Sequence, residues 1–227
     1  MLDVFFDKWW RLGGVMGILF LILLIVGIGL QGETPNYDDS VDKIRDWYAD
    51  NGKQFILGNY LTALAFVLFF LPFLSSLRAL LARAEGGDAI WSRVTFTGGV
   101  VLLLLCAVGS TFGAALAFSL DVVKEGDEDT LRTLKYLEYS TPAALALVPF
   151  LLGTSIVILR SGVLWRWLAI AGVVLAILAV IGGASSLEAE PYGGIPGIGM
   201  AAFPLSALWI LLVSINMVLK KEAPAAA

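Results

Sequence analysis

The chain has 227 residues, of which 59% are hydrophobic and 15% are charged. Soluble domains carry roughly 25% charged residues, so most side chains of this chain are expected to face lipid or the interior of a membrane bundle. Histidine is absent and Cys106 is the sole cysteine. This excludes a disulfide within one chain, a histidine-ligated zinc or haem site and a histidine-based hydrolase. We therefore expect no cofactor.

Six apolar segments are long enough to cross about 30 Å of hydrocarbon as helices of about 20 residues. The sequence therefore predicts an all-α integral membrane protein, with a bundle of six transmembrane helices in one domain over residues 1–227. The first segment follows a short charged start, but its far end makes a poor signal-peptide cleavage site, so we interpret it as a membrane anchor. The predicted spans are residues 13–31, 55–77, 95–120, 140–159, 164–186 and 198–219.

The two sides of the predicted bundle differ in their balance of basic and acidic residues. Basic residues outnumber acidic ones on the side that holds both termini, whereas the other side is strongly acidic. Basic residues near helix ends are retained in the cytoplasm, so we expect a multi-pass protein of the inner (plasma) membrane with cytoplasmic termini. The basic residues on this side are Lys8, Arg11, Arg78, Arg83, Arg93, Arg160, Arg166, Lys220 and Lys221.

Both long outer loops are expected to contain short amphipathic helices. In the first loop, Asp39 is a candidate cap for a helix whose apolar face holds Val41, Ile44, Trp47 and Tyr48. We expect this helix to lie on the membrane surface or over the bundle. In the second loop, Asp129 or Thr130 is expected to start a helix with Leu131, Leu134 and Leu137 along one stripe.

Proline occurs inside the second, fourth and sixth spans, at Pro72, Pro149 and Pro204. Proline removes a backbone hydrogen bond, so these even-numbered helices are expected to be kinked. No lysine, aspartate or glutamate falls within a predicted span. The sequence therefore offers no attachment point for a retinal-type Schiff base, and it disfavours proton transport through a buried carboxylate.

Small residues recur along two spans at helical spacing. They allow helices to approach closely, either within the chain or against a partner, and packing within the chain is the interpretation we favour. The helix-packing candidates are Gly13, Gly17, Gly109, Gly113, Cys106 and Ser110.

Two polar regions are weaker candidates for binding. An acidic group in the two outer loops would hold a divalent cation if the loops met, although its spacing does not match a calcium-binding loop and a solvated acidic face is the simpler interpretation. A glycine-rich outer connector is either a plain turn or a segment that lines a ligand cavity together with Asn59. The acidic residues are Asp38, Asp39, Asp42, Asp127, Glu128 and Asp129, and the connector residues are Tyr192, Gly193, Gly194 and Gly197.

Three short segments carry a resemblance to known proteins: the acidic loop Pro35-Asn36-Tyr37-Asp38-Asp39-Ser40, the segment Gly58-Asn59-Tyr60-Leu61 and the pair Leu77-Arg78. In these segments the first half of the chain resembles uncharacterised bacterial polytopic membrane proteins that are grouped as domains of unknown function. The resemblance implies a bacterial inner membrane and transfers no active site.

The sequence supports three classes of function. The first is a non-catalytic accessory or assembly subunit that packs against a membrane-protein partner or a second copy, because small-residue seams occur without buried charge. The second is a transporter, channel or lipid-binding protein with a cavity near the kinked even-numbered helices and the glycine-rich connector. An enzyme that uses outer carboxylates ranks third, because no nucleophile or metal site is positioned. Membrane lipids are expected partners and nucleic acid is not.

Overall fold

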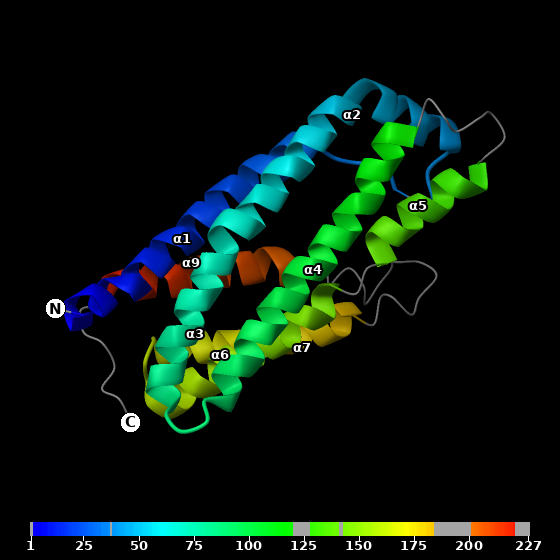
Figure 1. Cartoon of the computed structure of the whole chain (residues 1–227). Coiled ribbons are helices and arrows are strands. Elements are labelled where there is room, and N and C mark those ends of the chain that lie inside the picture. The colour runs from blue at the N-terminus through cyan, green and yellow to red at the C-terminus, as the bar shows by residue number, and fades with distance from the viewer. Residues whose placement is uncertain (1, 37, 120–127, 141–142, 184–200, 221–227) are drawn as a thin grey trace.

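The computed structural model describes residues 2–36, 38–119, 128–140, 143–183 and 201–220, and every regular element in these ranges is helical (Figure 1). Six helices are long and apolar enough to cross a membrane, which confirms the predicted all-α class and the number of spans. The elements are α1 (Leu2–Gln31), α2 (Val41–Leu64), the π-helical η1 (Ala65–Phe70), α3 (Leu71–Glu85), α4 (Ile90–Ser119), α5 (Glu128–Ser140), α6 (Ala143–Ser161), α7 (Arg166–Gly183) and α9 (Ala202–Leu219).

The second span is much longer than its apolar part. Helices α2, η1 and α3 follow one another without a break over Val41–Glu85, a stretch of 45 residues. At about 1.5 Å per residue the helical stretch is roughly 67 Å long, more than twice the thickness of the hydrocarbon. Its first turns must therefore project beyond the apolar layer.

Two expectations about the first outer helix are therefore wrong. The amphipathic segment from Val41 to Tyr48 is not a separate surface helix but the beginning of the second span, because nothing between it and the apolar segment stops the helix. The N-cap is Ser40 rather than Asp39, since the Ser40 hydroxyl accepts a hydrogen bond from the Lys43 N–H at 3.3 Å. The second outer segment is helix α5, which begins one residue before Asp129.

Pro72 explains the π-helical turn in the middle of the second span. Proline has no N–H to donate, and its ring presses on the carbonyl four residues earlier. The turn before it is widened, and the Leu71 N–H donates to the Phe66 carbonyl five residues back. The widened segment Ala65–Phe70 packs against α1, where the Phe20 ring lies 5.1 Å from the Phe66 ring and 4.9 Å from the Phe70 ring.

A row of aromatic rings fills the centre of the bundle. Phe70 lies 6.1 Å from Phe150 of α6, and Phe150 lies 5.8 Å from Trp209 of α9, measured between ring centroids. All three side chains are buried, and the Trp209 Nε1 donates to the Leu168 carbonyl of α7 at 2.7 Å. The row therefore links the second, fourth, fifth and sixth spans through one apolar core.

A smaller core lies at the end of the bundle where α2 begins. The first turns of α2, the last turns of α4 and helix α5 meet there around buried Ile44, Tyr48, Phe55 and Leu116. Lys135 of α5 is also fully buried, and its ammonium donates to the Tyr48 hydroxyl at 3.2 Å. This contact ties α5 to the projecting part of α2.

Helices α4 and α6 cross in close contact. A Cβ atom added at Gly98 would lie 2.6 Å from the backbone nitrogen of Phe150, and one added at Gly153 would lie 2.9 Å from the backbone nitrogen of Thr95. The Thr154 hydroxyl lies 3.4 Å from the Thr95 hydroxyl between these two points. Only glycine allows this distance between the two backbones.

We predict that Gly98→Ala lowers the free energy of unfolding by about 1–3 kcal/mol, because the added methyl group overlaps backbone that cannot move independently. The measurement is unfolding by dodecyl sulfate from mild detergent micelles, followed by circular dichroism. Gly29→Ala is the matched control, because no atom lies within 4 Å of a Cβ placed there. Equal stability of the two variants would contradict the close crossing.

Candidate functional site

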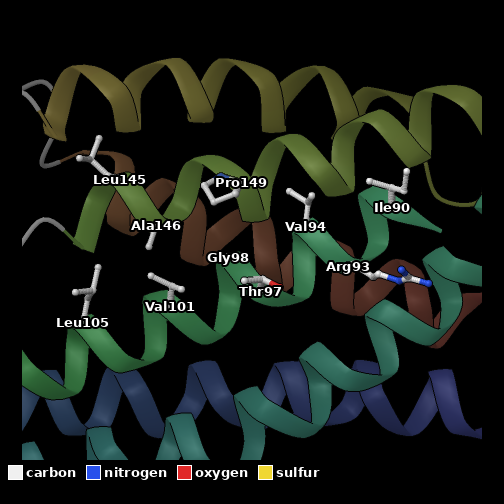
Figure 2. Close-up of a pocket in the computed structure, with 10 residues that line it drawn as sticks. All are labelled: Ile90, Arg93, Val94, Thr97, Gly98, Val101, Leu105, Leu145, Ala146 and Pro149. Carbon is white, nitrogen blue, oxygen red and sulfur yellow. The ribbon is translucent and has the colours of Figure 1, made fainter. Parts of the chain in front are cut away.

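A groove of about 560 Å³ runs along the outside of the bundle between α4 and α6 (Figure 2). It is open to the surroundings, since Ile90, Val101 and Leu145 on its walls are 58%, 40% and 44% exposed. The lining residues are Ile90, Arg93, Val94, Thr97, Gly98, Val101 and Leu105 of α4, and Leu145, Ala146 and Pro149 of α6.

The helical repeat of α4 explains how one helix supplies most of the lining. Its seven lining residues lie on one face of the helix, because Ile90, Val94 and Gly98 repeat every four residues and so do Arg93, Thr97, Val101 and Leu105. Gly98 lies midway along this face and has no side chain, while Ala146 opposite is small. The close crossing thus leaves a hollow beside it, with the Pro149 ring at one wall.

The two ends of the groove differ in polarity. Leu105 and Leu145 lie at one end, and Ile90 and Arg93 lie at the other (Figure 2). Arg93 is the one charged lining residue and Thr97 the one hydroxyl. The groove is therefore lined mainly by carbon atoms and has one positively charged side chain, Arg93, at one end.

A carboxylate from the preceding helix fixes the α4 turn that carries Arg93. The Glu85 carboxylate accepts hydrogen bonds from the backbone N–H groups of Trp91 and Ser92 at 2.8 and 2.9 Å. These N–H groups are otherwise without partners at a helix start, and a negative charge there is favoured by the helix dipole. The connection turns sharply, with φ of +67° at Gly86 and +52° at Gly87.

The helix-packing candidates lie inside the bundle. A Cβ at Gly13 would overlap Ser76 of α3, and one at Gly17 would overlap Ser214 of α9, so both glycines face neighbouring helices of the same chain. Gly109 and Gly113 are buried on α4. Cys106 is half-buried against the main core, and its carbonyl accepts a hydrogen bond from the Ser110 hydroxyl at 2.9 Å.

Of the ligand-lining candidates, the structure describes Asn59. Asn59 lies on α2, and its amide nitrogen is buried without a hydrogen-bond partner among the residues that the structure describes. It does not line the groove between α4 and α6. Tyr192, Gly193, Gly194 and Gly197 lie outside the described ranges.

The acidic residues that were candidates for a cation site are partly engaged within the chain. The Asp39 carboxylate is 2.8 Å from the Lys43 ammonium and accepts the Asn36 N–H, and these two hydrogen bonds lower the Asp39 pKa below its usual value. Asp42 lies 3.9 Å from Arg45. Asp38 and Asp129 are exposed, whereas Asp127 and the Glu128 side chain lie outside the description. Within the described ranges, no three carboxylate or thiol side chains are grouped to hold a metal.

The sequence predicts a cavity near the kinked even-numbered helices, and the groove lies beside one of them, α6, but its lining by one face of α4 was not predicted. Pro149 was singled out as a kink and Arg93 as a marker of orientation, but nothing linked them. The available signal was the Gly98-Gly99 pair together with Gly153, which marks two spans able to approach closely.

No protein-family model matches this chain, and neither curated proteins nor solved structures include a match.

We predict that Glu85→Ala lowers the free energy of unfolding by about 1 kcal/mol, because two N–H groups at the start of α4 lose their acceptor. Thermal unfolding in detergent measures the loss. Asp88→Ala is the control, since Asp88 is an exposed acidic residue of the same connection whose side chain makes no interaction with the described residues. A larger effect of Asp88→Ala than of Glu85→Ala would show that the capping contact is incorrect.

Proposed function

We propose that this chain is a non-catalytic multi-pass membrane protein that binds a lipid molecule in the groove between α4 and α6. The observation that carries the proposal is the carbon-lined hollow of about 560 Å³ on a surface formed by two apolar spans. A flexible hydrocarbon chain matches such a lining, and the surrounding bilayer supplies it at high concentration.

The length of the groove also supports a lipid. Fifteen residues separate Ile90 from Leu105, which corresponds to roughly 22 Å along α4. One leaflet contributes about 15 Å of hydrocarbon and a headgroup layer of several ångströms. The groove is therefore as long as one phospholipid molecule in one leaflet.

The packing of the bundle favours binding at its side over passage through its centre. Phe70, Phe150 and Trp209 occupy the middle of the bundle and are buried. A pathway along the axis would have to separate these rings. The groove, by contrast, opens sideways, where a lipid can enter without any rearrangement of the core.

An accessory or assembly subunit stays a prediction. Gly13 and Gly17, which suggested a seam for a partner, face Ser76 and Ser214 within the chain, so they supply no separate argument for another protein.

The basic residues at the ends of the spans support a further part of the proposal, namely that both termini and the Arg93 end of the groove face the cytoplasm.

We predict that Val101→Trp reduces the amount of co-purified lipid by roughly tenfold, because the indole occupies the middle of the groove. The measurement is native mass spectrometry of protein extracted in mild detergent. Val174→Trp on α7 is the matched control, because Val174 is 52% exposed and is not a groove residue. Wild-type protein without bound lipid, or equal lipid on both variants, would contradict the proposed function.

A further inference from the structure

Arg93 gives the groove a means to distinguish lipid headgroups. It lies in the first turn of α4, on the same stripe as Thr97 and Val101, at one end of the carbon-lined hollow (Figure 2). We infer that the groove selects an anionic phospholipid, whose phosphate is bound by the Arg93 guanidinium while an acyl chain lies along α4. This inference rests on the proposed function, because it specifies the headgroup of the same ligand.

The position of Arg93 along the helix matches the headgroup layer. The next polar lining residue, Thr97, lies one turn and roughly 6 Å deeper, where the ester groups of a phospholipid are found. Beyond Thr97 the α4 lining consists of Gly98, Val101 and Leu105. From Arg93 inward, the α4 lining thus passes from a cation through Val94 and a hydroxyl to hydrocarbon, which complements phosphate, ester and acyl chain, while Ile90 lies beside Arg93 at the same end.

The charges around Arg93 leave its guanidinium available. The residue is exposed and forms no ion pair with any described residue. The nearby Glu85 carboxylate is held by the N–H groups at the start of α4, and Arg78 of α3 lies over the Phe96 ring at 5.5 Å. The remaining acidic group of the connection, Asp88, is exposed, while Arg160 adds a positive charge near the end of α6.

The chemistry of the guanidinium favours a phosphate diester. Its planar N–H groups donate two parallel hydrogen bonds to phosphate oxygens, and it remains charged at all physiological pH values. A zwitterionic lipid also has a phosphate, but its ammonium group cancels the net charge. An anionic lipid keeps the full attraction, worth about fivefold in binding for one basic side chain near a membrane surface.

The test uses the full chain in nanodiscs that contain equal amounts of phosphatidylglycerol and phosphatidylcholine. Bound lipid is released from the nanodisc with the protein and counted by native mass spectrometry. We expect the wild type to retain phosphatidylglycerol over phosphatidylcholine by about fivefold. Arg93→Gln is expected to retain the same total lipid with no preference, and Arg93→Lys to restore part of the preference. Soluble glycerol phosphate at millimolar concentration is expected to leave bound lipid unchanged.

Arg166→Gln is the matched control, because Arg166 is another exposed arginine at the same end of the bundle and does not line the groove. Equal retention of both lipids by the wild type, or an unchanged preference in Arg93→Gln, would overturn the inference while the proposed function stands. Displacement by glycerol phosphate would show a site for a soluble phosphate and would also overturn it. Absence of any retained lipid on the wild type would instead overturn the proposed function.

Discussion

The close crossing of α4 and α6 is the contact on which the rest of the arrangement depends. Gly98 and Gly153 remove two side chains at this crossing, so the backbones approach to distances that any larger residue prevents. In a bilayer there is little hydrophobic driving force between helices, and close packing of this kind is a main source of their association. Gly98 also lines the hollow that becomes the groove, because it has no side chain to fill that position. Stability and the candidate site therefore arise from one feature.

The other spans hold this pair in place. Helix α6 packs against α7, while α3 packs against both α4 and α6. The aromatic row from Phe20 to Trp209 fills the space between them. Pro72 contributes indirectly, because the π-helical turn before it turns Phe66 and Phe70 against α1. The smaller core around Tyr48 and Lys135 joins the start of α2 to the end of α4 and to α5. The groove is thus a surface feature of a well-packed bundle.

The sequence predicts the features that depend on local hydropathy. All six spans were found because each holds enough apolar residues to cross the hydrocarbon. The ends of the last three spans lie within about four residues of the predicted ones, whereas the first and second helices begin more than ten residues earlier than predicted. The sequence did not reveal that the helix starting at Val41 continues into the second span. The composition changes there from amphipathic to apolar, and this change is the same for one continuous helix as for two separate helices. Ser40 and Asp39 are adjacent residues of equal capping ability, so composition could not separate them.

The groove depends instead on which helices become neighbours. Gly98 and Phe150 lie far apart in the sequence, and no periodic pattern states that α4 pairs with α6. Arg93 carried information only about orientation until the pairing of α4 with α6 placed it at one end of a groove. The sequence also could not show which helices the glycines contact. Gly13 and Gly17 allow close packing against another helix of the same chain as well as against a partner protein.

Electron cryomicroscopy of the full chain in nanodiscs made from its own membrane tests the central claim most directly. We predict an elongated density of non-protein material against α4, with its broad end beside Arg93 and its narrow end beside Leu105. A groove filled by another part of the protein, or one left empty at a resolution that shows side chains, would contradict it.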